Sequence, residues 1–267
     1  MGLYILDKPT GISSNRALSE FKHKNNISKV GFSGVLDPFA SGLLIIATGA
    51  HTRLLDIFLN QEKTYRGKIL FGKTTDTLDT EGKITSEADN VELTIKDIRA
   101  EIKKSFLGDI KQTPPIYSNI KVNGKRAREL ALKGKEVKLK PKDRTIYSFE
   151  IKSFGNNEAE FKVKVSSGTY IRQLAFDLGK ELGYPAMLLE LRRTKIGNIK
   201  VGNKKLVPYK AAGLKTLKIT KEQETDLLNG KKVDLSVNIK ELVVLSEESD
   251  LWVKKSENGY KIHKRLR

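Results

Sequence analysis

One aspartate, Asp37, lies in a loop whose composition would leave its carboxylate accessible. Residues 31–38 read GFSGVLDP and stand directly before an apolar segment. Glycines permit a positive φ or the close approach of a ligand, and Pro38 disfavours helical geometry for the residue before it. A carboxylate displayed in this way can act as a nucleophile or a base. Taken alone, the same pattern is more often an ordinary turn.

Arg172 is the second residue with chemical potential. It stands at the start of a predicted helix, between Ile171 and Leu174, which belong to the apolar stripe of that helix. A buried guanidinium needs an anionic partner. Arg172 therefore has one of three roles. It forms a structural ion pair, it extends its aliphatic stem along the apolar surface with its charge in solvent, or it holds an anion for function.

Composition narrows the classes of function. The 267 residues include 50 Lys and Arg against 32 Asp and Glu, a net charge of +18. This charge favours binding to RNA, DNA or another polyanion, although a merely solvated basic surface would look the same. The chain has no cysteine, and its three histidines have no metal-site or general-base spacing, so we expect no metal and no cofactor. We also expect no membrane segment or signal peptide, and a cytoplasmic location.

Patterning predicts the elements that position these residues. The expected strands and helices, in chain order, are a strand ending at residues 7–9, a helix capped by Ser13 or Ser14 and running to about Lys24, a strand 43–47, a helix around 52–59, a strand 65–71, a helix from Thr94 to near Phe106, paired strands 145–154 and 160–166, a helix from about 170 to Gly183, a capped helix ending at Gly230, and strands 242–245, 251–254 and 260–263.

Three further segments are predicted as turns or surface. Residues 74–82 hold Asp76, Asp79 and Glu81, but their spacing does not fit a calcium loop, so we interpret the segment as a polar loop. Asn123-Gly124 predicts a tight turn. The lysine-rich residues 133–142 could follow phosphates or form a solvated loop.

Five segments together resemble the TruB family of bacterial tRNA pseudouridine synthases, which act on uridine 55 in the T-loop. The resemblance runs from Leu6 to about Lys200, and its matching segments are LDKPTGISSN, KVGFSGVLDPFASGLL, KTYRGKILFGKTTDTLDTEG, QTPPIYSNIKVNGKRA, and SSGTYIRQLAFDLGKELG with LRR from Leu191. Five segments in the same order are far more specific than one loop.

The resemblance implies roles for individual residues. Asp37 matches the catalytic aspartate, Tyr65 the active-site tyrosine, and Arg172 the arginine that pairs with the aspartate and keeps it ionised and in line. Ile171 and Leu191 would form apolar walls. The remaining implied substrate-binding residues are Lys8, which would contact phosphate or support the loop, and Phe32.

Two features depart from the family. Many members have histidine where this chain has Phe32, which can stack on RNA but cannot donate a ring hydrogen bond. The family's C-terminal RNA-binding domain, PUA-like in many members, would have to fit within residues 215–267. We therefore expect a catalytic domain at 1–214 and a short, divergent or truncated RNA-binding region at 215–267.

The implied fold is α/β of the α+β type, with a central mixed, largely antiparallel sheet flanked by helices and a small C-terminal tail domain. The implied partner is the T-arm of tRNA, bound by a monomer. Two alternatives remain, namely a pseudouridine synthase with a different RNA target and a non-catalytic basic RNA-binding protein. A glycoside hydrolase would need a second carboxylate, which the matched segments do not supply.

Overall fold

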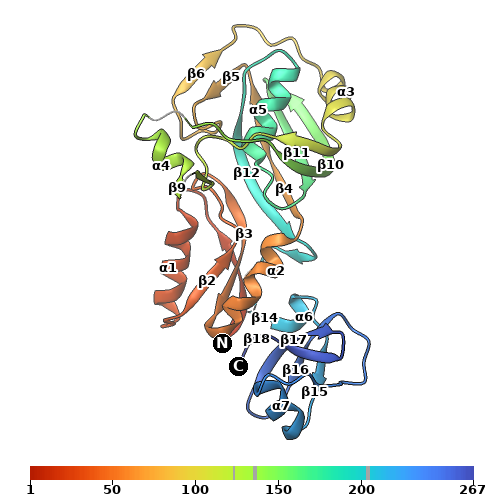
Figure 1. The fold of residues 1–267 in the computed structure, drawn as a ribbon. Coiled ribbons are helices and arrows are strands. Elements are labelled where there is room, and N and C mark those ends of the chain that lie inside the picture. The colour runs from red at the N-terminus through yellow and green to blue at the C-terminus, as the bar shows by residue number, and fades with distance from the viewer. Residues whose placement is uncertain (123, 135–136, 203–204) are drawn as a thin grey trace.

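The structure, a computed structural model, describes residues 1–267 except 123, 135–136 and 203–204. Within these residues, the centre is a ten-stranded sheet of order β14-β1-β3-β12-β4-β11-β10-β7, with β2 paired to β3 and β13 to β12 (Figure 1). Only the short contact between β3 and β12 is parallel among the pairings described in this sheet. The predicted α+β fold with a mixed, largely antiparallel sheet is confirmed.

The strands of this sheet are β1 Gly2–Lys8, β2 Val30–Ser33, β3 Ser41–Thr48, β4 Lys63–Phe71, β7 Gly108–Gln112, β10 Lys142–Gly155, β11 Glu158–Val165, β12 Ala186–Ile196, β13 Ile199–Lys200 and β14 Lys205–Leu206. Two small ribbons pair β5 Lys73–Thr75 with β6 Ile84–Glu87, and β8 Lys121–Val122 with β9 Lys125–Arg126. The helices are α1 Ser14–Lys24, the 3₁₀ helix η1 Gly49–Leu54, α2 Leu55–Asn60, α3 Ile95–Ser105, α4 Ala127–Ala131, α5 Ile171–Glu181, α6 Pro208–Ala211 and α7 Lys221–Leu228.

Side-chain alternation divides the sheet into a buried and an outer face. On β4, Tyr65, Ile69 and Phe71 are buried, while Arg66 between them is exposed. The buried face of β4, β10, β11 and β12 packs against α3 and α5 in one apolar core. A second core lies against β1 and β3 at the other half of the sheet. The junction of the two halves is where β3 meets β12.

Capping side chains mark the starts of three helices. The Ser13 side chain accepts a hydrogen bond from the Arg16 amide and caps α1, and capping boxes at Thr94 and Thr220 open α3 and α7. Residues 52–59, predicted as one helix, are helical throughout but are divided between the 3₁₀ helix η1 and the α-helix α2. Residue 123 of the predicted turn and residues 135–136 of the lysine-rich segment lie outside the described residues.

The tail forms a small sheet, β15-β16-β17-β18, from β15 Thr216–Lys218, β16 Glu241–Leu245, β17 Asp250–Ser256 and β18 Gly259–Arg265. One face of this sheet packs with α7 in a separate hydrophobic core. On the other face, Val243 and Trp252 pack in the core that lies against β1 and β3. Figure 1 shows the tail at one end of the molecule, beside α6. No helix in the described part of the chain is long and apolar enough to cross a membrane.

Candidate active site

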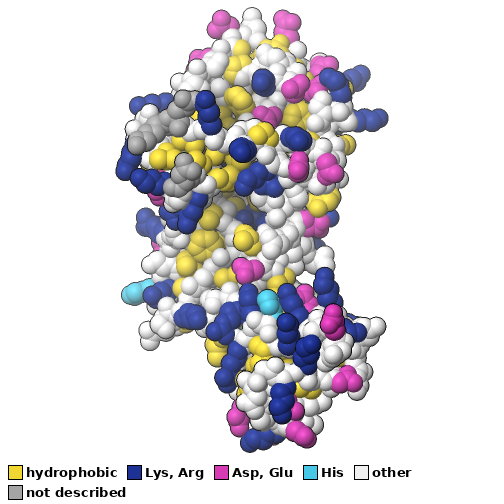
Figure 2. Space-filling view, in the orientation of Figure 1, with side chains coloured by type: hydrophobic (Ala, Val, Ile, Leu, Met, Phe, Trp, Pro, Cys, Tyr) yellow, Lys and Arg dark blue, Asp and Glu magenta, His cyan; other side chains and the backbone are white. Residues whose placement is uncertain are grey.

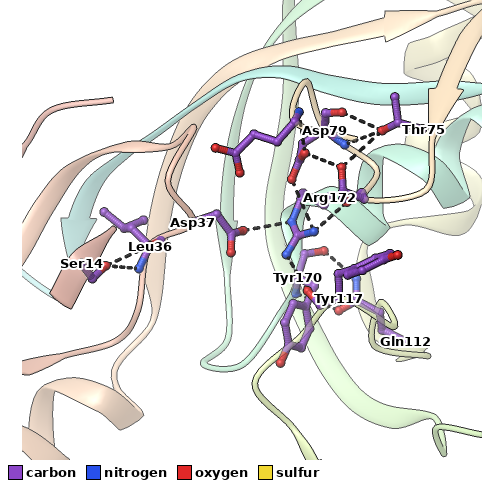
Figure 3. A network of polar contacts seen from close by, with 11 residues as sticks. Ser14, Leu36, Asp37, Thr75, Asp79, Gln112, Tyr117, Tyr170 and Arg172 are labelled. Atoms are coloured by element: carbon purple, nitrogen blue, oxygen red, sulfur yellow. Dashed lines mark hydrogen bonds and ion pairs between the residues drawn. The ribbon is translucent and has the colours of Figure 1, made fainter. Parts of the chain in front are cut away.

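Asp37 lies between β2 and β3 in a loop anchored by α1. The Ser14 hydroxyl donates to the carbonyl of Leu36 at 2.9 Å and accepts from its amide at 2.8 Å (Figure 3). Gly34 adopts φ +73°, a conformation that favours glycine. The Asp37 side chain is 37% exposed, so the anchored loop displays the carboxylate as the sequence predicted.

Arg172 holds that carboxylate from the first turn of α5. The guanidinium is 5% exposed, and its Nε donates to Asp37 Oδ2 at 2.9 Å. Nη1 donates to the Thr77 carbonyl at 2.6 Å, and Nη2 donates to the Tyr117 carbonyl at 3.1 Å. Nη1 also lies 3.4 Å from Asp79 Oδ2. All three nitrogens are therefore bonded, which fixes the orientation of the group that faces Asp37.

Asp79 was missed by the sequence analysis, which assigned its segment to a polar loop. It is 2% exposed, and its backbone and carboxylate bond to Thr75, Thr77 and the amide of Glu81. These hydrogen bonds within the loop fix the position of the Asp79 carboxylate, which is the second carboxylate, after Asp37, to pair with Arg172. The buried arginine required such an anion, but nothing in the spacing of residues 74–82 named Asp79 as that anion.

The start of α5 is fixed by Gln112 at the end of β7. The Gln112 amide donates to the Tyr170 carbonyl at 3.0 Å and accepts from the Tyr170 amide at 2.9 Å. This reciprocal pair holds the residue that precedes α5, so Arg172 begins from a defined position. Burial raises the pKa of the Tyr170 phenol.

A cavity of about 310 Å³ brings together five of the seven residues predicted for the site. Its lining includes Asp37, Tyr65, Ile171, Arg172 and Leu191. It also includes residues the sequence analysis did not nominate, chiefly Lys63, Tyr117, Ser118, Asn119, Arg128, Tyr170 and Arg193. The walls therefore combine one displayed carboxylate with aromatic and apolar surfaces and several cations.

Phe32 does not line this cavity. It lies on β2, opposite Ile46 of β3, and is half-buried. The side chain projects from a strand that ends before the Asp37 loop begins. A contact of Phe32 with RNA stays a prediction, but the base-sized cavity does not include it.

Lys8 is also outside the cavity lining, and it is completely buried. Its ammonium group donates to the carbonyls of Pro9, Ile12 and Pro38 at 2.9, 2.7 and 3.2 Å. Burial lowers the pKa of Lys8, while the charge of Asp37 acts in the opposite direction. Of the two roles left open for Lys8, these contacts support the loop rather than reach a phosphate.

We expect Lys8→Met to displace the Asp37 loop, because the carbonyls of Pro9, Ile12 and Pro38 lose their shared donor. The free energy of unfolding should fall by about 1–3 kcal/mol. Activity should fall by roughly tenfold at a temperature where the variant stays folded, since a displacement near 1 Å already costs catalysis heavily. Urea unfolding and single-turnover rates measure both effects. Lys22→Met, on the exposed face of α1, is the matched control, and equal behaviour of the two variants would contradict the assignment.

Two further cations shape the cavity. Arg193 is 1% exposed and donates to the carbonyls of Leu43 and Gly34, at 2.8 and 2.9 Å. Lys63 donates to carbonyls at the end of α2, and burial lowers the pKa of this lysine to about 8. Beside the Asp37 pair, Glu81 has a raised pKa, first from burial and then from the charges of Asp79 and Asp37.

This arrangement can deliver an oriented carboxylate to a small planar ligand. Asp37 is accessible, and the bonds to Arg172 fix its direction. Tyr65, at 8% exposure, lines the same cavity from the buried face of β4. The chemistry available from these residues is covalent or general-base catalysis by a carboxylate.

The fold class is shared with solved structures over the whole chain. The structures described as "Crystal Structure of a Cbf5-Nop10-Gar1 Complex" and "Crystal structure of the archaeal box H/ACA sRNP Nop10-Cbf5 complex" both superpose with a TM-score of 0.70. They are 21% and 20% identical in sequence, and the match covers 100% of this chain and 85% and 86% of theirs. At this identity the likeness establishes the fold.

Sequence comparison then defines the family. Residues 22–171 match the family model described as "TruB family pseudouridylate synthase (N terminal domain)". "tRNA pseudouridine synthase B" of Aquifex aeolicus is 45% identical over 202 residues, which cover 75% of this chain and 70% of that protein. The protein of the same name from Thermosipho melanesiensis is 37% identical, covering 95% and 87%. The chain belongs to the TruB family and is a pseudouridine synthase, an isomerase.

Proposed function

We propose that this enzyme converts uridine 55 in the T-loop of tRNA to pseudouridine, with Asp37 as the catalytic carboxylate. The observation that carries the proposal is the displayed Asp37, bonded to buried Arg172 beside a cavity of about 310 Å³. The relatives named tRNA pseudouridine synthase B support tRNA as the substrate. The matched family model spans residues 22–171, which include Asp37.

The reaction involves no net redox change and no gain or loss of atoms, so we propose that a carboxylate suffices without a cofactor. The N1–C1′ glycosidic bond breaks, the uracil turns, and C5 joins C1′. The proton on C5 then leaves and N1 gains one, so atoms and electrons balance. The Asp37 carboxylate can attack C1′, attack C6, or remove a ribose proton in a glycal route. Each route starts from the same oriented carboxylate.

Arg172 and Tyr65 complete the proposed machinery. Arg172 keeps the carboxylate directed into the cavity through its bond to Oδ2. Tyr65 stacks on the uracil, and its phenol is available for the proton transfer at C5. Ile171 and Leu191 provide apolar walls around the base.

Entry into the cavity requires the target nucleotide to leave its stack. Base flipping costs a few kcal/mol, and aromatic and apolar walls around the base offset that cost. Basic side chains then hold the RNA by its phosphates without reading its sequence. Figure 2 shows Lys and Arg over both the main body and the tail on the face in view. We propose that the region 215–267 adds RNA affinity, and that the enzyme acts as a cytoplasmic monomer.

The proposal is tested by incubating the purified protein with an unmodified tRNA transcript and mapping pseudouridine to the nucleotide. Conversion at uridine 55 is the expected result. Conversion only at another position would assign the alternative of a synthase with a different target. Binding without conversion, with the protein shown to be folded, would leave a non-catalytic RNA-binding protein.

A further inference from the structure

A row of three cations crosses the outer face of the central sheet. Strand register places Lys162 of β11 opposite Arg66 of β4, and Arg66 opposite Arg192 of β12. Like charges directly opposite one another on adjacent strands destabilise a sheet. The outer face therefore carries an electrostatic cost at this row, which we call the cationic row.

The next row on the same face is balanced. Lys68 of β4 stands opposite Glu160 of β11 and Glu190 of β12, and its ammonium group lies 3.5 Å from the Glu190 carboxylate. The acidic neighbours raise the pKa of Lys68. The same three strands thus pair opposite charges in one row and leave like charges together in the adjacent row.

Among the described residues, Arg66 and Lys162 lack the bonded carboxylate that Arg192 has. Arg192 bonds to Asp7 at 2.6 Å and to the Ser41 hydroxyl at 3.3 Å. In the described part of the chain, neither Arg66 nor Lys162 makes an ion pair or a side-chain hydrogen bond. Glu150 of β10 stands directly opposite Lys162, but its carboxylate is bonded to the Lys152 ammonium group at 2.5 Å.

The row forms part of the wall of a hollow of about 640 Å³, larger than the catalytic cavity. Five basic side chains line it against two acidic ones, Glu160 and Glu190. Phe39 and Thr80 also line it, and they lie two residues after Asp37 and one residue after Asp79. The hollow thus extends to the loop that carries Asp37 and to the loop that carries Asp79, which is an ion-pair partner of Arg172.

We propose that the cationic row binds backbone phosphates of the RNA substrate, as a second contact separate from the catalytic cavity. A phosphate supplies a bonded anion to Arg66 and Lys162, and its binding offsets the repulsion within the row. RNA is the favoured source of the phosphate because the hollow extends to the catalytic loops. The inference rests on the proposed function, since it takes RNA as the substrate.

The test uses the double variant Arg66→Gln/Lys162→Gln with full-length unmodified tRNA. Affinity should fall by about tenfold at moderate salt, and the slope of log K against log salt should flatten by about 1 to 2, for one or two lost phosphate contacts. The single-turnover rate at saturating enzyme should equal that of the wild type. Without RNA, the thermal midpoint should be equal or higher, because the repulsion is reduced.

The matched control is Lys96→Gln/Lys103→Gln, which removes the same charge from exposed positions on α3. A loss of affinity equal to that of the control would overturn the proposal, as would an unchanged salt slope. Glu160→Gln provides the reciprocal variant, because it removes an acidic group from the hollow and should tighten binding. If the wild type itself fails to bind tRNA, the proposed function fails. If the wild type binds tRNA but the double variant binds it as tightly as the control variant does, this inference alone fails.

Discussion

Replacing Asp37 with Asn is expected to lower pseudouridine formation by at least about a thousandfold, because the nucleophile is removed. Asparagine has nearly the same shape, and its amide oxygen can still accept from Arg172. The cavity and the cationic surface should therefore remain intact. Binding of tRNA should stay within about twofold of the wild type. Single-turnover conversion of a tRNA transcript and equilibrium binding at one salt concentration measure the two quantities.

Asp89→Asn is the control for this prediction, because it makes the same chemical change at an exposed position outside the cavity. It should behave as the wild type in both assays. A comparable loss of affinity and rate in Asp37→Asn would contradict the catalytic assignment, since a binding residue affects both. Retention of more than about a tenth of the rate would also contradict it.

Local physics made much of the fold predictable. The capping boxes at Thr94 and Thr220 and the Ser13 cap are signals within four residues, and α3, α7 and α1 begin where those signals stand. The hairpin of β10 and β11 turns at Asn156 and Asn157, both with positive φ, which asparagine tolerates better than most residues. Such features need no knowledge of distant contacts.

The site was less accessible from local patterns. Asp37 and Arg172 are 135 residues apart in sequence, and only the family resemblance placed them together. Asp79 looked like a polar loop residue, because its burial depends on Arg172 arriving from α5. Lys8 presented the opposite problem, since its charge suggested a phosphate contact while three carbonyls enclose it in the fold. In each case the decisive partner comes from another segment.

The burial of Asp79 makes a strong prediction for Arg172→Met. Methionine replaces the stem of the arginine but leaves Asp79, at 2% exposure, without its cation. Removing one partner of a buried ion pair typically costs about 3–5 kcal/mol. We expect a loss of this size in urea unfolding, and a loss of activity of about a hundredfold or more, because Asp37 loses the group that orients it.

The double variant Arg172→Met/Asp79→Asn separates the two effects. Neutralising Asp79 removes the unpaired buried charge, so the double variant should recover much of the lost stability. It should not recover activity, because Asp37 still lacks its partner. A double variant no more stable than Arg172→Met would show that the cost comes from lost packing and from the freed carbonyls of Thr77 and Tyr117. Recovered activity would show instead that Arg172 serves only to neutralise Asp79. The bond from Arg172 would then not be needed to orient Asp37.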